Sequence, residues 1–286
     1  MTLPDLPEPF YWTQSACGLV LKCRPLDAVA PHCFTTRSIP VASAADWDAV
    51  GEALGAAGVV TLTQVHGRDV LTVRPGSARG NGAACGDALV SSDPDVAVAV
   101  RAADCVPLLL GDRRTGVVAA VHAGWRGTAA GAAVAAVSAM ATGFGARPED
   151  LTVAVGPSIG PCCYEVGSDL VDAFAAAGHP RHLVERWIVS APPRREDGRC
   201  GLRPLARPSL RLDLRQANRD QLIAAGVPDA QIHDCGLCTA MHLEVLTSYR
   251  VEKAGAGRIA GAIRCRQASG PPPDPSPRLP GDRRPG

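Results

Sequence analysis

Two histidines and one cysteine stand beside turns in the first half of the chain, His66 in TQVHG, Cys105 in AADCVPLLLGD and His122 in VHAGWRG. Imidazole and thiolate groups are preferred zinc ligands. A catalytic zinc takes three protein ligands and keeps a fourth position open, whereas a structural zinc usually has four. The set therefore indicates chemistry at a bound water or substrate, although spacing alone also allows three unrelated side chains beside strands.

Strongly apolar segments lead into all three residues. VVTLTQV runs into His66, DVAVAVRAADC into Cys105 and GVVAAV into His122. Such segments are typical of buried strands, and strand ends can converge on one edge of a sheet. This context favours a single metal centre held by His66, Cys105 and His122.

A series of longer blocks surrounds these residues in a fixed order. The blocks are TQVHG, GDALVSS, ADCVPLLLGD, VHAGWRGT, VGPSIGPCCYEVG, DLRQANRDQLIAAGV, GLCT, SYR and GRIAGAIR. Through them the chain, from about Val29 to Arg264, resembles the laccase-domain or polyphenol-oxidase family, whose members are also described as purine nucleoside phosphorylases and as a peptidoglycan editing factor. The resemblance implies the same three metal ligands, activity on nucleosides, and helices layered around two packed sheets.

Catalytic and anion-binding candidates adjoin the predicted ligands. Asp104 directly precedes Cys105 and is placed either to orient that ligand and exchange a proton with a leaving group, or simply to bond the backbone of its turn. Gly124 and Arg126 follow His122 where a helix is expected to begin, and the first amides of a helix can bind an anion. Arg126 adds positive charge there, unless it only faces solvent.

Four further residues are candidates for substrate binding. Ser158 lies in a glycine-rich turn that a ligand could approach closely. Arg37, Arg250 and Arg258 carry guanidinium groups, which bind phosphate oxygens through paired donors. Arginine is also frequent on solvated surfaces, which is the alternative at each position.

A second metal cluster is suggested by Cys235 and Cys238, flanked by His233 and His242. A single C-x-x-C without a matched second pair is a weak signal of metal binding. Small core cysteines are the alternative.

Composition is that of an ordinary globular enzyme. The 286 residues are 46% hydrophobic, enough for a sizeable core, and the net charge of +1 gives no reason to expect nucleic acid or a membrane as partner. No leader-like segment opens the chain and no stretch approaches about 18 apolar residues. We therefore expect a cytoplasmic protein with its 11 cysteines reduced. The family resemblance implies nucleoside and phosphate as its small-molecule partners. Nothing in the sequence indicates an oligomeric state.

The elements expected to position these residues interleave without strict alternation. We predict an α+β fold of mixed β-sheets in a layered α/β/β/α arrangement, forming one catalytic domain over 1–266 with an exposed loop at 191–208 and a disordered Pro-rich tail at 267–286. The predicted strands are 18–24, 30–36, 151–155 and 258–264, with strands also dominating between 54 and 122. The predicted helices are 45–54, 127–140, one from near Tyr164 to Gly178, and 213–225.

Two segments depart from the family's usual pattern. Ser38-Ile39-Pro40 stands where a glycine-rich turn and a polar segment are usual, which predicts an altered wall of the substrate pocket. The segment 245–251 lacks the usual aromatic residues before Ser248, which predicts weaker stacking on a base.

Three functional classes remain open. The first is a zinc-dependent purine nucleoside enzyme that cleaves adenosine, inosine or methylthioadenosine with phosphate and deaminates adenosine. The second, also suggested by the resemblance, is a cysteine hydrolase of a peptidoglycan precursor, with Cys105 as nucleophile and His122 as base. The third is a metal-binding partner protein without activity. With 7 histidines and no His-x-His pair a multicopper laccase site is not expected, although the His2Cys set also suits one copper ion and copper-dependent oxidation.

Overall fold

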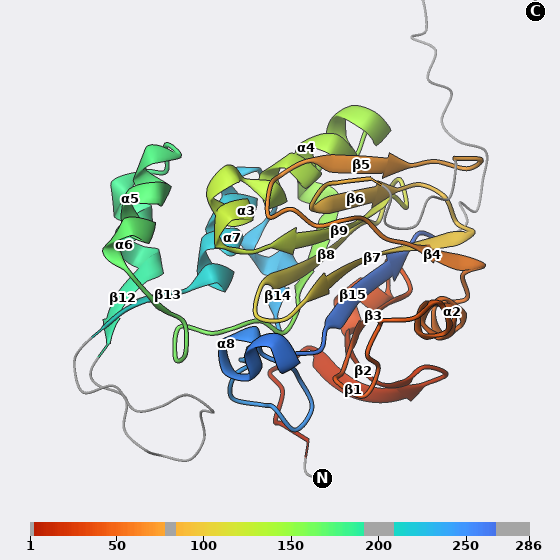
Figure 1. Cartoon of the computed structure of the whole chain (residues 1–286). Helices are drawn as coiled ribbons and strands as arrows, with labels where there is room; N and C mark the ends of the chain where they lie inside the picture. The colour runs from red at the N-terminus through yellow and green to blue at the C-terminus, as the bar shows by residue number, and fades with distance from the viewer. Residues whose placement is uncertain (1–2, 78–83, 192–208, 267–286) are drawn as a thin grey trace, which may run out of the picture.

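Two packed β-sheets form the centre of the molecule, and helices cover both outer faces (Figure 1). The computed structural model describes residues 3–77, 84–191 and 209–266. The predicted α+β fold with layered mixed sheets is confirmed. The predicted tail at 267–286 and all but the first residue of the predicted loop at 191–208 lie outside the described residues. None of the helices in these ranges combines the length and apolar character of a membrane span.

The first sheet contains the N-terminal strands and the last strand of the chain. Its order is β1-β2-β3-β15-β7-β4, and all neighbours are antiparallel except the parallel pair β4 and β7. The strand bounds are β1 Phe10–Ser15, β2 Gly18–Cys23, β3 His32–Thr35, β4 Gly58–Val60, β7 Val96–Ala102 and β15 Ile259–Arg264. The short helix α1, Arg24–Asp27, joins β2 to β3.

The second sheet is built mainly from the middle of the chain. Its order is β14-β10-β8-β9-β6-β5, with parallel pairing of β10 to β14 and of β5 to β6 and antiparallel pairing elsewhere. The strand bounds are β5 Val70–Val73, β6 Ala88–Ser91, β8 Val106–Asp112, β9 Val118–Ala123, β10 Leu151–Val155 and β14 Ile232–Asp234.

The core between the two sheets follows from the alternation of side chains along each strand. In β7, Val96, Val98 and Val100 belong to the cluster that also contains residues of the second sheet, such as Leu109 of β8. The intervening small residues of β7 belong to a separate cluster, under α2. Apolar residues on both faces explain why the strands between 54 and 122 appear as nearly continuous apolar runs.

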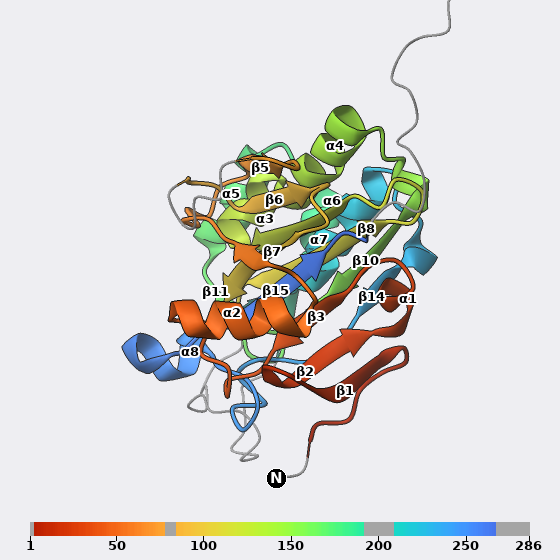
Figure 2. The same ribbon diagram turned by 90° about the vertical axis from the view of Figure 1, so that its right-hand side faces the viewer.

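Helix α2, Ala44–Ala53, lies across the outer face of the first sheet (Figure 2). It begins at a capping box in which Ser43 and Asp46 satisfy each other's backbone amides. The prediction of a helix over 45–54 is confirmed.

Three helices cover the outer face of the second sheet: α3 Trp125–Ala130, α4 Ala132–Phe144 and α7 Leu214–Ala224. The helix predicted over 127–140 is therefore two helices. Gly131 separates them with a left-handed backbone, φ 81°, which glycine adopts at little cost. Helix α7 matches the prediction, because Asp213 caps its first turn and Gly226 follows its end.

A smaller sheet and two helices stand beside this layer. The sheet has the order β11-β13-β12, and the elements are β11 Glu165–Val166, α5 Ser168–Ala176, α6 Arg181–Trp187, β12 Ile188–Ala191 and β13 Ser209–Leu212. The helix predicted from near Tyr164 begins at Ser168 instead, because Glu165 and Val166 pair with β13. Helix α6 and the strands β1, β12 and β13 were not predicted.

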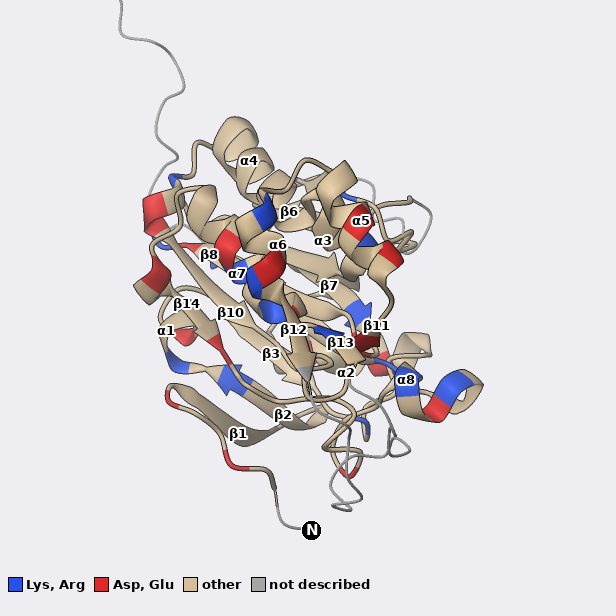
Figure 3. Cartoon of the chain, turned by 90° about the vertical axis from the view of Figure 1, so that its left-hand side faces the viewer, with Lys and Arg blue, Asp and Glu red and all other residues tan. Residues whose placement is uncertain are grey.

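Short helical turns complete the described chain. They are η1 Pro148–Asp150, η2 Asp229–Gln231, α8 Tyr249–Glu252 and η3 Lys253–Gly255. Charged residues lie mainly on the helices and turns at the outside, while the central strands are mostly uncharged (Figure 3).

Candidate metal centre and adjoining cavity

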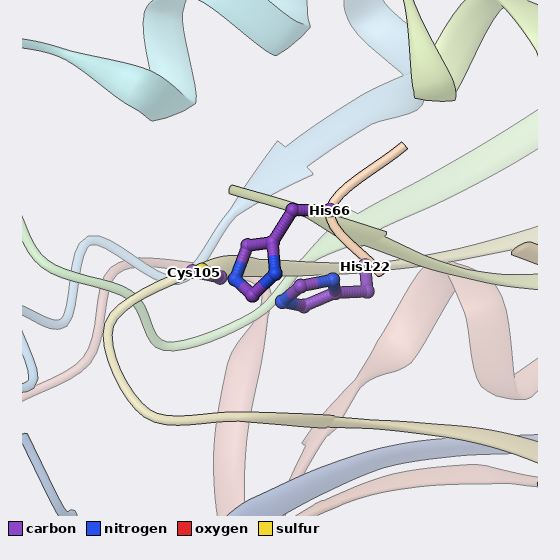
Figure 4. A group of neighbouring side chains, drawn as sticks. All are labelled: His66, Cys105 and His122. Atoms are coloured by element: carbon purple, nitrogen blue, oxygen red, sulfur yellow. The ribbon is translucent and has the colours of Figure 1, made fainter. Parts of the chain in front are cut away.

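The side chains of His66, Cys105 and His122 converge on one point (Figure 4). Each offers one ligand atom, and these three atoms lie within 4.8 Å of one another. His66 lies in the segment between β4 and β5, Cys105 in the turn between β7 and β8, and His122 in β9. The two imidazole rings meet edge to face, with centroids 4.9 Å apart. The structure thus brings together the three residues predicted as ligands, in an arrangement that could hold a metal ion.

The backbone at His66 has a left-handed conformation, with φ 60°. This region is uncommon for residues other than glycine and asparagine, so neighbouring bonds have to maintain it. Asp87 supplies them: its carboxylate accepts hydrogen bonds from the amides of His66 at 2.9 Å and Gly67 at 2.6 Å. The turn that presents His66 is therefore wrapped around a buried carboxylate.

The same carboxylate orients His122. Oδ1 of Asp87 lies 2.8 Å from Nδ1 of His122, and both side chains are buried. With Nδ1 engaged, Nε2 is the nitrogen left to bind a metal, as in carboxylate–histidine–zinc triads. Asp87 was not among the residues predicted for the site. Asp87 stands in the block GDALVSS, which already carried the family resemblance. Only the pairing of β6 with β9 shows which histidine this carboxylate supports.

Gly124 leaves room beside the predicted ligands. A Cβ atom at this position would lie 2.8 Å from Sγ of Cys105 and 3.0 Å from Cδ2 of His66. A Cβ contact as short as that to Sγ is essentially never seen, so only glycine fits here without movement of a ligand. The His2Cys donor set, the oriented imidazole of His122 and the space beside Gly124 together fit a bound zinc or copper ion.

Cys105 and His122 also form a charged pair. Burial would raise the pKa of Cys105, but hydrogen bonds and charge from His122 and His66 outweigh it and lower this pKa to about 7. Burial would lower the pKa of His122, yet its bonds to Asp87 and Cys105 raise it to about 9. A thiolate is therefore available near neutral pH, and an incoming cation would displace the proton shared with His122.

Asp104 occupies a constrained position at the turn before Cys105. Its φ is 90°, and its carboxylate accepts hydrogen bonds from the Thr239 hydroxyl at 2.6 Å and the Arg250 amide at 2.6 Å. Burial raises the pKa of Asp104 and outweighs these bonds, which act in the opposite direction. A backbone held in a sparsely populated region with a buried acid is common at functional sites.

A cavity of about 1010 Å³ adjoins the three ligands. Its lining contains five cationic side chains, Arg101, Arg126, Arg250, Lys253 and Arg258. Asp104 is the one carboxylate among the described lining residues. The excess of positive charge suits an anionic ligand such as phosphate.

Aromatic side chains form another part of the cavity lining, namely Trp125, Tyr164 and Tyr249. The guanidinium of Arg126 lies 4.4 Å from the Trp125 ring centroid and that of Arg250 lies 5.1 Å from the Tyr164 centroid. Such stacking holds each guanidinium in place beside a flat apolar surface. Trp125 and Tyr249 were missed as site residues.

The predicted substrate residues fall into two groups. Arg126, Arg250 and Arg258 line the cavity, and Gly124 lies beside the ligands. Arg37 and Ser158 are not among the described lining residues. Arg37 instead pairs with Glu252 at 3.0 Å and donates to the carbonyl of Leu243, and the Ser158 side chain is fully buried.

The other sequence expectations have mixed outcomes. Pro40 lines the cavity, so the segment that departs from the family pattern does border the pocket.

The C-x-x-C pair does not form the suggested second cluster. Cys235 is buried in the core between the sheets, and Cys238 instead lies near Cys162 and Cys163.

An open His2Cys set beside a positively charged cavity defines a protein with a possible mononuclear metal site and space for a small molecule. The chain belongs to the multi-copper polyphenol oxidoreductase laccase family, whose sequence model matches residues 39–266. The three predicted ligands and all of the described cavity-lining residues lie within this match, whereas Arg37, which does not line the cavity, stands just before it.

Relatives within the family have names of two kinds. The chain is 36% identical over 215 residues to "Purine nucleoside phosphorylase YlmD" of Geobacillus stearothermophilus, covering 73% of this chain and 72% of the relative. It is 40% identical over 177 residues to "Adenosine deaminase RL5" of an unknown prokaryotic organism, covering 62% and 61%. The crystal structure of YlmD from Geobacillus stearothermophilus superimposes with a TM-score of 0.73 at 31% identity, covering 91% of this chain and 100% of that chain.

Proposed function

We propose that this protein is a zinc-dependent purine nucleoside enzyme, which cleaves adenosine, inosine or methylthioadenosine with phosphate and deaminates adenosine. The observation that carries the proposal is the position of the His66, Cys105 and His122 set at the wall of a cavity lined by five cations and by aromatic rings. The names of the relatives support both activities.

His66, Cys105 and His122 would hold the ion, and Asp87 would keep His122 in the required tautomer. When bound, zinc would orient phosphate or lower the pKa of water towards neutrality. Copper fits the same ligands, and copper-dependent oxidation of phenols is the alternative within the metal hypothesis. The thiolate of Cys105 suits a reducing compartment, so a cytoplasmic location is part of the proposal.

The cavity offers separate surfaces for the parts of a nucleoside and phosphate. Arg126 and Arg250 would bind phosphate oxygens, and the Tyr164 and Tyr249 rings would lie against the purine. In phosphorolysis a phosphate oxygen attacks C1′ of ribose as the C1′–N9 bond breaks. The electron pair moves to the purine, which takes a proton at N7. Asp104 would supply this proton, giving free base and ribose 1-phosphate.

Deamination would use the same acid. Water adds to C6 of adenosine, and the amino group takes a proton and leaves as ammonia, so that inosine remains. Asp104 would move the proton from the attacking water to the leaving nitrogen, since it lines the same cavity. Both reactions would therefore use Asp104 as the acid, beside N7 in phosphorolysis and beside the neighbouring 6-amino group in deamination.

The pairing of Cys105 with His122 favours a second candidate, a cysteine hydrolase acting on a peptidoglycan precursor. A thiolate beside a protonated imidazole held by a carboxylate is the arrangement of a nucleophile, base and orienting group. In this scheme Cys105 attacks a carbonyl carbon and His122 protonates the leaving amine. The two schemes give Cys105 opposite duties.

Chelation followed by alkylation separates them. Under the zinc proposal, metal-free protein loses adenosine turnover, Cys105 becomes open to alkylation, and zinc restores activity only if added before the alkylating reagent. Chromatography of reactions with and without phosphate then assigns adenine to phosphorolysis and inosine to deamination. A Cys85→Ser variant controls for an exposed thiol outside the cavity. Full adenosine turnover by verified metal-free protein would overturn the zinc proposal, and hydrolysis of a peptidoglycan precursor by that protein, stopped by alkylation of Cys105, would favour the cysteine hydrolase.

A further inference from the structure

Three cysteines form a second group of sulfur atoms outside the cavity. Cys162 and Cys163 lie in the turn after β10, and Cys238 follows β14. Their Sγ atoms all lie within 4.8 Å of one another, and among the described residues this is the other group with metal-ligating potential besides His66, Cys105 and His122. Cys163 and Cys238 are buried, whereas Cys162 is exposed, so one side of the group is open to an entering ion.

The surroundings place a hydrogen-bond donor and a positive charge beside the sulfurs. The amide of Gly160 donates a hydrogen bond to Sγ of Cys238 at 3.2 Å. The guanidinium of Arg215 lies beside the group, because a Cβ atom at Gly160 would be 3.1 Å from its Nη2 and 3.3 Å from Sγ of Cys162. The Arg215 side chain is only 13% exposed. Its Nη1 is buried and has no hydrogen-bond partner among the described residues.

We propose that Cys162, Cys163 and Cys238 bind a thiophilic d¹⁰ cation, Cu⁺ or Zn²⁺, at a site separate from the catalytic cavity. Three sulfurs around such an ion, at metal–sulfur distances of about 2.3 Å, lie about 3.8–4.0 Å apart. The three Sγ atoms in the structure lie within 4.8 Å of one another, so small side-chain movements would bring them to these distances. Thiolates select Cu⁺ and Zn²⁺ over harder ions, and Arg215, which also pairs with Asp234 at 3.6 Å, places positive charge beside the three sulfurs. A disulfide would use only two of the three sulfurs.

An ion at this site would join two chain segments that adjoin the catalytic cavity. Cys238 directly precedes Thr239, whose hydroxyl bonds Asp104. The amide of Tyr164 donates to the carbonyl of Gly160 at 2.9 Å, within the turn that contains Cys162 and Cys163. An ion joining these two segments should therefore stabilise the folded chain, since it binds only where the segments meet.

Metal titration in a chain without the other centre tests this proposal. The background variant is His66→Asn/Cys105→Ser, reduced, stripped of metal and kept free of oxygen. Zn²⁺ and Cu⁺ are added in separate experiments, each against a competing chelator. Bound ions are counted by native mass spectrometry, and thiolate coordination is followed by charge-transfer absorption. We expect one bound ion per chain and a higher Tm with the ion than without it. The relative affinities for Zn²⁺ and Cu⁺ identify which of the two ions the site prefers.

Adding Cys162→Ser and Cys238→Ser to the background should reduce affinity at least tenfold and remove the rise in Tm. Adding Cys85→Ser, another exposed cysteine, should change neither. Cys162→Ser alone serves if the variant at the buried Cys238 does not fold, because Cys162 is exposed. Absence of a bound ion in the background, or binding unchanged by the serine variants, overturns the proposal. So does a Cys162–Cys238 disulfide formed with oxidised glutathione in protein that binds neither ion when reduced.

Discussion

Oδ1 of Asp87 lies 2.8 Å from Nδ1 of His122, and both side chains are buried. The same carboxylate holds the backbone of His66 and Gly67, so one residue directly before β6 fixes two of the three predicted metal ligands. Such an acid positions ligands without touching the ion, and ligand orientation controls metal affinity.

Asp87→Asn should lower zinc affinity by about 10–100-fold, the range usual for loss of a group that orients a ligand. The amide nitrogen of Asn cannot accept the bonds that Oδ2 accepts from the turn amides. Competition with a chromophoric chelator measures the change. Asp69→Asn, at an exposed position nearby, is the matched control and should bind zinc normally. Equal affinity in the two variants would contradict the role given to Asp87.

Replacements at His66 should separate metal binding from folding, because its φ is 60°. Asn tolerates this conformation, whereas the β-branched Val does not. His66→Asn should lose the zinc of the His2Cys centre yet unfold near the wild-type urea midpoint, with both proteins metal-free. His66→Val should be less stable than His66→Asn by about 1–2 kcal/mol. Full zinc occupancy in His66→Asn would remove His66 from the ligand set.

Gly124→Ala should weaken metal binding although its φ of −74° suits alanine. The new methyl group would lie 2.8 Å from Sγ of Cys105, so this ligand would have to move. Metal content after dialysis against a weak chelator gives the readout. Gly143→Ala in α4 is the control, since its Cβ would meet nothing closer than 3.8 Å. If Gly124→Ala retains metal as well as the control does, the open position is not needed for binding.

Arg126→Gln and Arg250→Gln should each raise the KM for phosphate by about 10–100-fold, the loss of one hydrogen bond to a charged group. Both side chains line the cavity and stack on aromatic rings. Initial rates at varied phosphate and saturating adenosine provide the measurement. Arg181→Gln, at a position 92% exposed on α6, should leave this KM unchanged. A phosphate KM that is the same in all three variants would exclude the cavity arginines as its binding site.

His32 should make stability depend on pH, at a distance from the metal centre. Burial lowers the pKa of His32 to about 4, so the unfolded chain binds the proton more tightly. The stabilising contribution is therefore complete above about pH 6.5 and is lost as pH falls to about 4, up to about 3 kcal/mol. Urea unfolding of metal-free protein at several pH values should show a smaller loss over this range for His32→Asn. Equal losses in the two proteins would contradict the assignment, with His242→Asn as a partly exposed control.

The sequence by itself determined the elements whose signals are local. Continuous apolar runs predicted most strands of the two sheets but not β1 or β14, and Asp213 and Gly226 predicted the ends of α7, because capping depends on residues a few positions apart. It also selected His66, Cys105 and His122, since each stands at the end of such a run. The prediction from sequence was wrong where pairing with a distant strand competed with local signals. Glu165, for example, pairs with β13 instead of opening a helix.

Only the tertiary structure decided what surrounds the three ligands. Asp87 reaches His122 because β6 pairs with β9, and Cys238 meets Cys162 rather than Cys235 because the turns after β10 and β14 lie side by side. The cavity likewise combines Arg101, Arg126 and Arg250 from separate elements. Strand order in a sheet results from burial of many side chains far apart in the chain, and local periodicity contains no information about which strand ends will meet.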